Sequence, residues 1–267
     1  MKILNAKKDL NFLQRQRVKT YQKTLLLDYD GTLAPFHIDP KEAYPYPGIR
    51  EMLNNILRMQ DIHLVIVTGR WKRDLRPLLS LEKQPEIWGC HGLERLKIDG
   101  TYEIATMDEK SLNGLVVADE WTEAVGLSSR SEKKPGCLAI HWRGLGENNT
   151  SALRKQVEPE WSLIAKSWGL NLREFDGGLE LRVPARNKGD AVKTVLEEME
   201  KETIVAYLGD DLTDEDAFKA IKGHGIGILV REKLRPTTAD IWIKPPDELI
   251  AFLSDWISES RKSHLFR

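Results

Sequence analysis

The sequence predicts an α/β fold, in which a doubly wound parallel sheet of the Rossmann type carries a small inserted α+β domain. Two patterns predict this fold. Towards both ends of the chain, short apolar runs alternate with helical stripes of apolar residues, as repeated βα units do. Between them, apolar and polar residues alternate, which indicates antiparallel strands with one solvated face. We therefore expect a core at 1–105 and 185–267 and the inserted domain at 106–184.

The N-terminal part of the core contains three predicted strands. Residues 25–27, 63–67 and 87–90 are apolar runs of the kind that form buried strands. Residues 47–60 carry apolar side chains at the i, i+3, i+4, i+7 spacing of a helix, and a second helix is expected after the second strand. Residues 1–22 mix basic and apolar residues, and we expect a helix on the core or a loose tail there.

The last third of the chain repeats the same alternation. Residues 204–208, 226–230 and 241–243 are predicted strands, and helical stripes run through 191–199 and 249–257. These βα units complete the parallel sheet.

The middle of the chain is predicted to hold strands of another kind. Residues 135–143 and 171–183 alternate between apolar and polar side chains, and residues 147–168 carry the apolar stripe of a helix. We expect an antiparallel sheet covered by this helix.

Composition excludes several classes of protein. The chain has 267 residues with 40 basic and 41 acidic side chains, a net charge of -1, which does not favour a nucleic-acid binder. Its two cysteines lie in no CxxC pair, so neither a disulfide framework nor a zinc site is expected. No apolar run is long enough for a membrane span, and the first residues do not form a signal peptide. We expect a cytoplasmic monomer.

The first polar motif is LLLDYDGTL at 25–33. Asp28 and Asp30 are two residues apart at the end of a predicted strand, so their side chains are expected on one side of it. Gly31 allows a turn that brings backbone amides close to an anion. Taken alone, the motif also fits an Asp-Gly turn with incidental aspartates.

Two further motifs provide groups that suit a phosphate. Thr68 and Gly69 follow the second predicted strand, and their hydroxyl and amides could bind phosphate oxygens. Lys188 stands at the start of a predicted helix, where the dipole and the ammonium both favour an anion. Alone, Thr68 also fits a helix N-cap, and Lys188 a solvated lysine.

The fourth motif is acidic. Residues 209–216 read GDDLTDED, and this many carboxylates repel one another unless a cation or base neutralises them. A set of oxygen ligands favours a hard ion such as Mg²⁺. Taken alone, the motif also fits an acidic helix start. Because open α/β sheets bind ligands at the carboxyl ends of their strands, we expect the four motifs to form one site.

Together these residues resemble the haloacid dehalogenase-like phosphatase superfamily. DYDGTL is similar to its first motif, Thr68 to its second, Lys188 to its third and GDDLTDED to its fourth. More narrowly, LLLDYDGTLAP, IVTGR, HGLE, GLELRVP, NKGDAV and GDDLTDEDAF resemble the trehalose-6-phosphate phosphatases. The resemblance implies a haloacid dehalogenase-like core with a mobile cap, and hydrolysis of trehalose 6-phosphate to trehalose and phosphate.

The resemblance also implies roles for the core residues. Asp28 would be the nucleophile that forms an aspartyl-phosphate, and Asp30 the general acid and base. Thr68, Gly69 and Lys188 would bind the phosphate. Mg²⁺ would be held by the Asp28 side chain, the Asp30 carbonyl and Asp210. Asp211 and Asp214 would hold metal-bound waters or Lys188.

Substrate choice is expected in the inserted domain. The resemblance implies that His91 of the core meets the sugar together with a set from the insertion: Glu132, Lys134, His141, Glu180 and Arg182. Strand alternation places Glu180 and Arg182 on one face. These residues also fit a solvated sheet face, and His91 fits a loop histidine with local hydrogen bonds.

Two alternative functions stay open at this point. Another sugar-phosphate phosphatase of the superfamily, acting on mannosyl-3-phosphoglycerate or sucrose phosphate, would share all four motifs and differ in its cap. A binding module in which Asp28 only accepts phosphate, like a receiver domain, would be much shorter and would lack the insertion.

Overall fold

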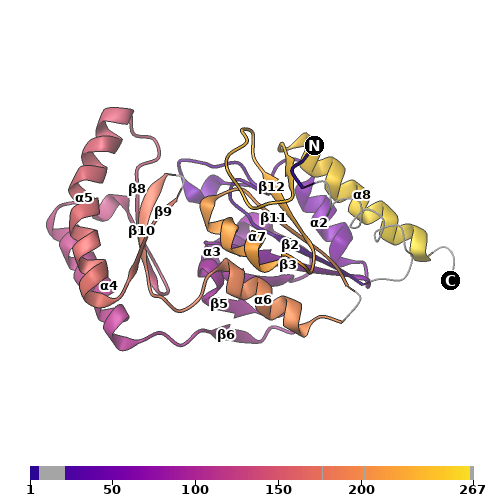
Figure 1. Ribbon diagram of the computed structural model, residues 1–267, viewed down its shortest axis with the longest axis horizontal. Helices are drawn as coiled ribbons and strands as arrows, with labels where there is room; N and C mark the ends of the chain where they lie inside the picture. Colours follow the sequence, from indigo (N-terminus) through magenta and orange to yellow (C-terminus); the bar gives the residue numbers. More distant parts are fainter. Residues whose placement is uncertain (6–21, 176, 201–202, 265–267) are drawn as a thin grey trace. The chain divides into compact units, whose positions relative to one another are not determined.

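The computed structural model describes residues 1–5, 22–175, 177–200 and 203–264, and the chain forms two compact units (Figure 1). Unit 1 consists of Met1–Glu103 and Asn187–Arg267, and unit 2 of Ile104–Arg186. Unit 2 therefore begins and ends within two residues of the insertion expected at 106–184.

Unit 1 contains a mostly parallel sheet. Its strand order is β1-β13-β12-β11-β2-β3-β4-β5-β6, and consecutive pairs from β13 through to β4 are parallel. β1 is antiparallel to β13, and β5 is antiparallel to β4. The strands are β1 (Lys2–Ile3), β2 (Lys23–Leu27), β3 (Ile62–Val67), β4 (Glu86–Gly89), β5 (Glu94–Leu96), β6 (Tyr102–Ile104), β11 (Ile204–Gly209), β12 (Ile226–Val230) and β13 (Ile241–Ile243).

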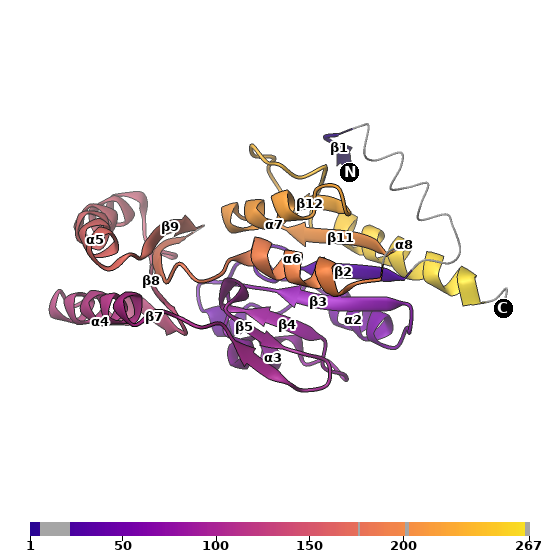
Figure 2. The same cartoon turned by 60° about the horizontal axis from the view of Figure 1, so that its bottom comes forward.

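Helices cover both faces of this sheet, because successive side chains of a strand point to opposite faces. On one face Leu25 and Leu27 pack with α2, α3 and α8, and on the other Leu26 packs with α6 and α7 (Figure 2). These apolar clusters form two buried layers that fix the strand ends. The helices are α2 (Ile49–Leu57), α3 (Lys72–Leu79), α6 (Lys188–Glu198), α7 (Glu215–Ala220) and α8 (Asp247–His264).

Unit 2 is a four-stranded antiparallel sheet with two helices on its apolar face. The strand order is β7-β8-β10-β9. Leu179 and Leu181 of β10 are buried together with Val157 and Trp161 of α5. The elements are α4 (Glu109–Ala124), β7 (Ser131–Lys134), β8 (Cys137–His141), α5 (Glu147–Trp168), β9 (Asn171–Phe175) and β10 (Gly178–Arg182).

Several details differ from the sequence-based prediction, which did not contain the short strands β5, β6 and β7. The alternating run at 171–183 is a hairpin of β9 and β10, and Gly177 has the positive φ of 101° that such a turn can require. α4 was not predicted. Within 1–22, Lys2 and Ile3 form a strand, whereas 6–21 lie outside the described residues. No helix of the described part is long and apolar enough to cross a bilayer.

Candidate active site

Lys188 joins two carboxylates at the carboxyl ends of β2 and β11. Its Nζ lies 2.7 Å from Asp28 Oδ1 and 2.7 Å from Asp214 Oδ1. Lys188 is the first residue of α6, and a capping box of Asn187 and Asp190 fixes this helix start. The motif NKGD therefore places a buried ammonium between the first and fourth motifs.

The Asp214 carboxylate is fully occupied by hydrogen bonds. Its Oδ1 accepts from Lys188 and from the Tyr207 hydroxyl, and its Oδ2 accepts from the backbone N–H groups of Asp210 and Asp211. A carboxylate offers about four lone-pair positions, so these donors use all of them. Asp214 therefore orients Lys188 and the acidic loop.

Asp210 has the opposite surroundings. It is 2% exposed, and its Oδ1 has no hydrogen-bond partner among the described residues. The backbone at Gly31 adopts a φ of 79° and comes so close that a Cβ there would lie 2.1 Å from Asp210 Oδ2. Only glycine fits at this position, and the unpaired carboxylate oxygen marks a place where a cation can bind.

The charges of this cluster perturb its pKa values. Burial, and then the charge of Asp214, raise the pKa of Asp28 to about 7, although Lys188 partly opposes them. Burial and the charge of Asp28 raise the pKa of Asp210 well above its usual range. For Lys188, burial acts against the charged form, but Asp214 and Asp28 outweigh it and raise the pKa. The negative charge of the buried carboxylates therefore exceeds the single positive charge of Lys188 beside them.

This cluster fits a hard divalent cation. Oxygen atoms of Asp28, Asp210 and Asp214 lie within 4.8 Å of one another, and all are the oxygen ligands that Mg²⁺ prefers. Because the hydrogen bonds to Asp214 are complete, Asp28 and Asp210 are the side chains left to bind the ion. Sequence reasoning chose the same two side chains together with the carbonyl of Asp30.

The Asp30 carboxylate points to a different partner. Arg70 donates from Nε to Asp30 Oδ2 at 2.7 Å and from Nη2 to Asp30 Oδ1 at 2.6 Å. A third bond, from Arg70 Nη1 to the Pro40 carbonyl at 2.7 Å, holds the guanidinium. Both aspartates follow β2, which ends at Leu27, so they do not share a strand as the sequence reasoning assumed. The structure groups Asp28 with Lys188 and Asp30 with Arg70.

The second motif forms a turn that packs against His91. Thr68 is buried, and its Oγ1 accepts from the Arg70 N–H at 3.1 Å. The Thr68 carbonyl accepts from the N–H of His91 at 2.9 Å, and a Cβ on Gly69 would lie 2.5 Å from His91 Cε1. A side chain at position 69 would therefore displace the imidazole of His91. His91 supports the turn at 68–70 from within unit 1.

In unit 2, the polar residues predicted to bind sugar form two rows on one face of the sheet. Glu132 and Glu180 both lie opposite Ala139 of β8, from the strands on either side of it. Lys134 and Arg182 lie opposite Cys137 in the same way. The backbones of Glu132 and Glu180 therefore stand about 10 Å apart, two strand spacings, with the small side chain of Ala139 between them.

These polar residues pair with one another. Glu132 Oε2 lies 2.9 Å from His141 Nε2 and 3.2 Å from Lys134 Nζ. Burial acts to raise the pKa of Glu132, but His141 and Lys134 outweigh it and lower the pKa to about 2. Arg182 pairs with Glu180, whose Oε2 also accepts from the Cys137 thiol at 3.2 Å. The predicted set thus forms an array of charges within unit 2.

Sequence reasoning missed Tyr207 and the pairing of Arg70 with Asp30. Tyr207 carries the one hydroxyl in an otherwise apolar strand, and a hydroxyl at a buried strand position could have indicated a buried hydrogen bond. Arg70 stands beside the predicted phosphate turn, but its partner is 40 residues away in sequence and gives no local signal.

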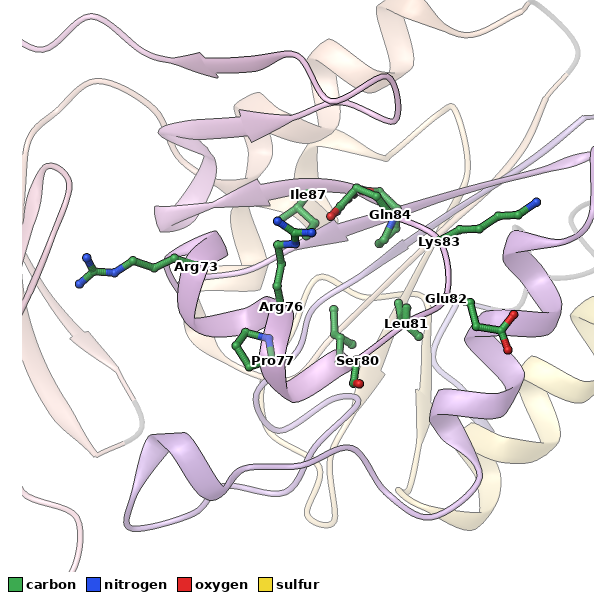
Figure 3. Close-up of a pocket in the computed structure, with 11 residues that line it drawn as sticks. Arg73, Arg76, Pro77, Ser80, Leu81, Glu82, Lys83, Gln84 and Ile87 are labelled. Carbon is green, nitrogen blue, oxygen red and sulfur yellow. Dashed lines mark hydrogen bonds between the residues drawn. The ribbon is translucent and has the colours of Figure 1, made fainter.

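A pocket of about 700 Å³ elsewhere in unit 1 contains none of the predicted site residues (Figure 3). It lies between α3 and the segment that leads into β4, with Arg76, Gln84 and Ile87 among its lining residues. This segment enters β4 at its amino end, whereas ligands of open α/β sheets bind at the carboxyl ends.

Comparisons with known proteins identify the family of the chain. The family model of trehalose-phosphatase matches residues 26–241. Trehalose-phosphate phosphatase B of Arabidopsis thaliana is 29% identical over 269 residues, covering 92% of this chain and 69% of that protein.

Solved structures show the same fold. The C-terminal domain of a C. albicans trehalose-6-phosphate phosphatase has a TM-score of 0.79 at 22% identity, covering 96% of this chain and 98% of that one. A haloacid dehalogenase-like hydrolase from Bacteroides thetaiotaomicron has a TM-score of 0.62 at 20% identity, covering 88% and 99%. The haloacid dehalogenase-like fold expected from the four motifs is confirmed, and the chain belongs to the trehalose-phosphatase family.

Proposed function

We propose that this protein hydrolyses trehalose 6-phosphate to trehalose and phosphate through an aspartyl-phosphate on Asp28. The observation that carries the proposal is the buried cluster in which Lys188 contacts both Asp28 and Asp214, with the unpaired carboxylate oxygen of Asp210 beside them. Membership of the family supports the trehalose phosphate over the mannosyl or sucrose alternatives.

The first half-reaction transfers the phosphoryl group to the protein. A carboxylate oxygen of Asp28 forms a bond to phosphorus while the bond from phosphorus to the sugar oxygen breaks. Asp30 gives a proton to the leaving sugar oxygen, for which the bonds to Arg70 must release one of its oxygens. Thr68, Gly69 and Lys188 bind the phosphoryl oxygens, where charge concentrates in a loose transition state.

The second half-reaction restores Asp28. Water attacks phosphorus and the bond to Asp28 breaks, so that inorganic phosphate leaves. Asp30 accepts the proton of the attacking water and returns to its starting form. Lys188 stays between Asp28 and Asp214 throughout, because Asp214 keeps it oriented.

Magnesium is part of this proposal. The Asp28 and Asp210 side chains and the Asp30 carbonyl would hold the ion. When bound, it would offset the repulsion between the Asp28 carboxylate and a dianionic phosphate. The excess of carboxylates in the cluster and the unpaired Oδ1 of Asp210 support this assignment.

Unit 2 is proposed to be the cap that binds the sugar part of the substrate. Its polar face offers carboxylates from Glu132 and Glu180 and cations from Lys134 and Arg182, the groups that bind sugar hydroxyls. His141 and, from unit 1, His91 complete the proposed set. The proposed cap is unit 2, Ile104–Arg186, and the proposed phosphatase core is unit 1.

A cytoplasmic location and a monomeric state also belong to the proposal. Both cysteines, Cys90 and Cys137, are free and buried, which suits a reducing compartment. Size-exclusion chromatography with light scattering would test the monomer.

The direct test is a phosphate-release assay on phosphorylated sugars. We expect trehalose 6-phosphate to be preferred over sucrose 6-phosphate and mannosyl-3-phosphoglycerate, and turnover to require added Mg²⁺. Asp28→Asn should fold and lose turnover, since an amide cannot form the aspartyl-phosphate. Preference for sucrose 6-phosphate would refute the substrate, and retained turnover by Asp28→Asn would refute the nucleophile.

A further inference from the structure

Arg235 makes a dense set of contacts to the backbone of the acidic loop. Its Nε donates to the Asp210 carbonyl at 3.2 Å and its Nη2 to the Asp211 carbonyl at 2.7 Å. Its Nη1 pairs with Glu215, the first residue of α7. Arg235 itself is only 14% exposed, so this planar fork is held within the protein.

Two threonines that follow Arg235 also form hydrogen bonds with α7. Glu215 Oε2 accepts from the backbone N–H and the hydroxyl of Thr238, each at 2.8 Å, and its Oε1 accepts from the Thr237 hydroxyl at 2.8 Å. The segment between β12 and β13 is therefore tied to both ends of the acidic loop, at Asp210 and at Glu215.

These bonds act on Asp210 through its backbone. The N–H of Asp210 donates to Asp214 Oδ2 at 3.0 Å, and its carbonyl accepts from Arg235 Nε at 3.2 Å and from Arg231 Nη1 at 3.4 Å. Arg235 is the one that also holds the next carbonyl, that of Asp211. The Oδ1 of Asp210 has no hydrogen-bond partner among the described residues, and its Oδ2 lies 3.7 Å from Arg231 Nη1, so the backbone bonds are the short contacts that orient this carboxylate. Arg235 also adds a positive charge beside a loop rich in carboxylates, which reduces their mutual repulsion.

We propose that Arg235 is a positioning residue for the cation site, fixing the backbone of Asp210 so that its carboxylate is ready to bind a divalent ion. This inference rests on the proposed function only for the presence of that site. It goes further by assigning the preorganisation of the site to a residue outside all four motifs.

The test measures metal binding directly, with Mn²⁺ as the probe and no substrate. The full chain is titrated with Mn²⁺, and the free ion is followed by electron paramagnetic resonance. Arg235→Gln should weaken Mn²⁺ binding roughly 10–100-fold, the usual loss when an outer-shell partner of a ligand is removed. Arg235→Lys keeps the charge but not the fork, so it should also bind more weakly than the wild-type protein.

Arg50 provides a matched control. Its Nε donates to the Leu79 carbonyl at 2.9 Å and its Nη2 to the Leu78 carbonyl at 3.1 Å, so it too bridges two consecutive carbonyls, but those of α3. Arg50→Gln should lower the unfolding midpoint and leave Mn²⁺ affinity as it is. An equal loss of Mn²⁺ affinity in this control would reduce the role of Arg235 to general stability.

The outcomes separate this inference from the proposed function. If the wild-type protein binds no Mn²⁺, or if folded Arg235→Lys binds it as well as the wild type, the inference is wrong whatever the phosphatase assay shows. If Arg235 variants lose Mn²⁺ affinity but the wild-type protein releases no phosphate from trehalose 6-phosphate, the positioning role stands and the proposed substrate is wrong.

Discussion

Asp210 and Asp214 belong to one acidic loop, and their carboxylates have opposite surroundings. Asp214 accepts hydrogen bonds at every lone-pair position, whereas Asp210 keeps an oxygen without a partner among the described residues. The sequence shows both simply as acids. Which of them can bind a cation depends on donors that come from β11, α6 and the loop itself, so only the three-dimensional contacts separate their roles.

Tyr207→Phe tests the hydrogen bonding of Asp214. The Tyr207 hydroxyl is buried and donates to Asp214 Oδ1. Its removal should lower the free energy of unfolding by roughly 1.5–3 kcal/mol, the range for a hydrogen bond to a charged group. Because Asp214 also holds Lys188, turnover should fall as well. Urea denaturation and the phosphate-release assay measure the two effects.

Tyr29→Phe is the control for this prediction. Tyr29 is equally buried, but its hydroxyl donates to the neutral carbonyl of Ala43 at 2.7 Å. Its removal should cost less, about 0.5–1.5 kcal/mol. If both substitutions destabilise the protein equally, the charge of Asp214 contributes nothing special to the Tyr207 bond.

At the scale of elements, apolar patterns predicted the parallel strands of unit 1 closely and missed β1, β5 and β6, which lie towards the edges of the sheet. Each predicted run overlaps a strand, as with 63–67 and β3 (Ile62–Val67), because parallel strands buried on both faces must be apolar throughout. α4 was missed because its buried face consists of small residues, Ser111, Gly114, Ala118 and Thr122. At Gly114, a Cβ would lie 2.3 Å from the Cβ of Trp168, so close packing replaces the apolar stripe.

A buried network at the β3–β5 edge predicts a pH dependence of stability. Glu86 accepts from Trp88 Nε1 and Arg95 Nε at 2.8 Å each, and its other oxygen lies 3.0 Å from His63 Nε2. Burial acts to raise the pKa of Glu86, but the hydrogen bonds from His63 and Arg95 outweigh it and lower the pKa. Arg95 also pairs with Glu198 of α6, which connects this network to the helix that begins at Lys188.

The sign of this dependence follows from the lowered pKa. The pKa of a Glu side chain in an unfolded chain is about 4.3. The stabilisation that the ionised Glu86 contributes is therefore complete above that pH, and it is lost as the pH falls through the lower pKa of Glu86 in the folded protein. Wild-type protein should therefore exceed Glu86→Gln in unfolding free energy at pH 7, and this difference should shrink below pH about 4. Urea denaturation of both proteins at several pH values measures it.

An exposed pair gives the comparison for Glu86. Glu82 pairs with Arg58, and both side chains are more than half exposed, so Glu82→Gln should change stability by less than about 1 kcal/mol at any pH. A wild-type advantage over Glu86→Gln that stays constant with pH would contradict the assigned cause.

At the scale of the whole molecule, the prediction of two units depends on a change in the hydrophobic pattern along the chain. Continuous apolar strands indicate a sheet buried on both faces, and alternating strands indicate a sheet with one polar face. The pattern could not show that the polar residues of unit 2 line up in rows. Glu132 and Glu180 are far apart in sequence and come to lie on either side of Ala139 only because their strands both pair with β8.

This division predicts that chemistry and sugar recognition can be separated by mutation. If the polar face of unit 2 reads the sugar, Glu180→Ala should reduce kcat/KM for trehalose 6-phosphate by at least roughly 10-fold, since a lost hydrogen bond to a charged group is worth about 1.5–3 kcal/mol. An aryl phosphate such as p-nitrophenyl phosphate has no sugar to recognise. Under the proposed function its turnover depends only on the cluster of Asp28, Lys188 and Asp214 in unit 1, so it should change little.

Glu174 provides the matched control for this separation. It lies on β9 opposite Leu179, on the other face of the same sheet, and pairs with Arg154 of α5 at 2.8 Å. Glu174→Ala removes a carboxylate from unit 2 without touching the polar face, so both substrates should be turned over as by the wild-type protein. Equal losses on both substrates in Glu180→Ala would mean that this carboxylate maintains the fold of unit 2 and does not select the sugar, because recognition must discriminate between the substrates and stability does not.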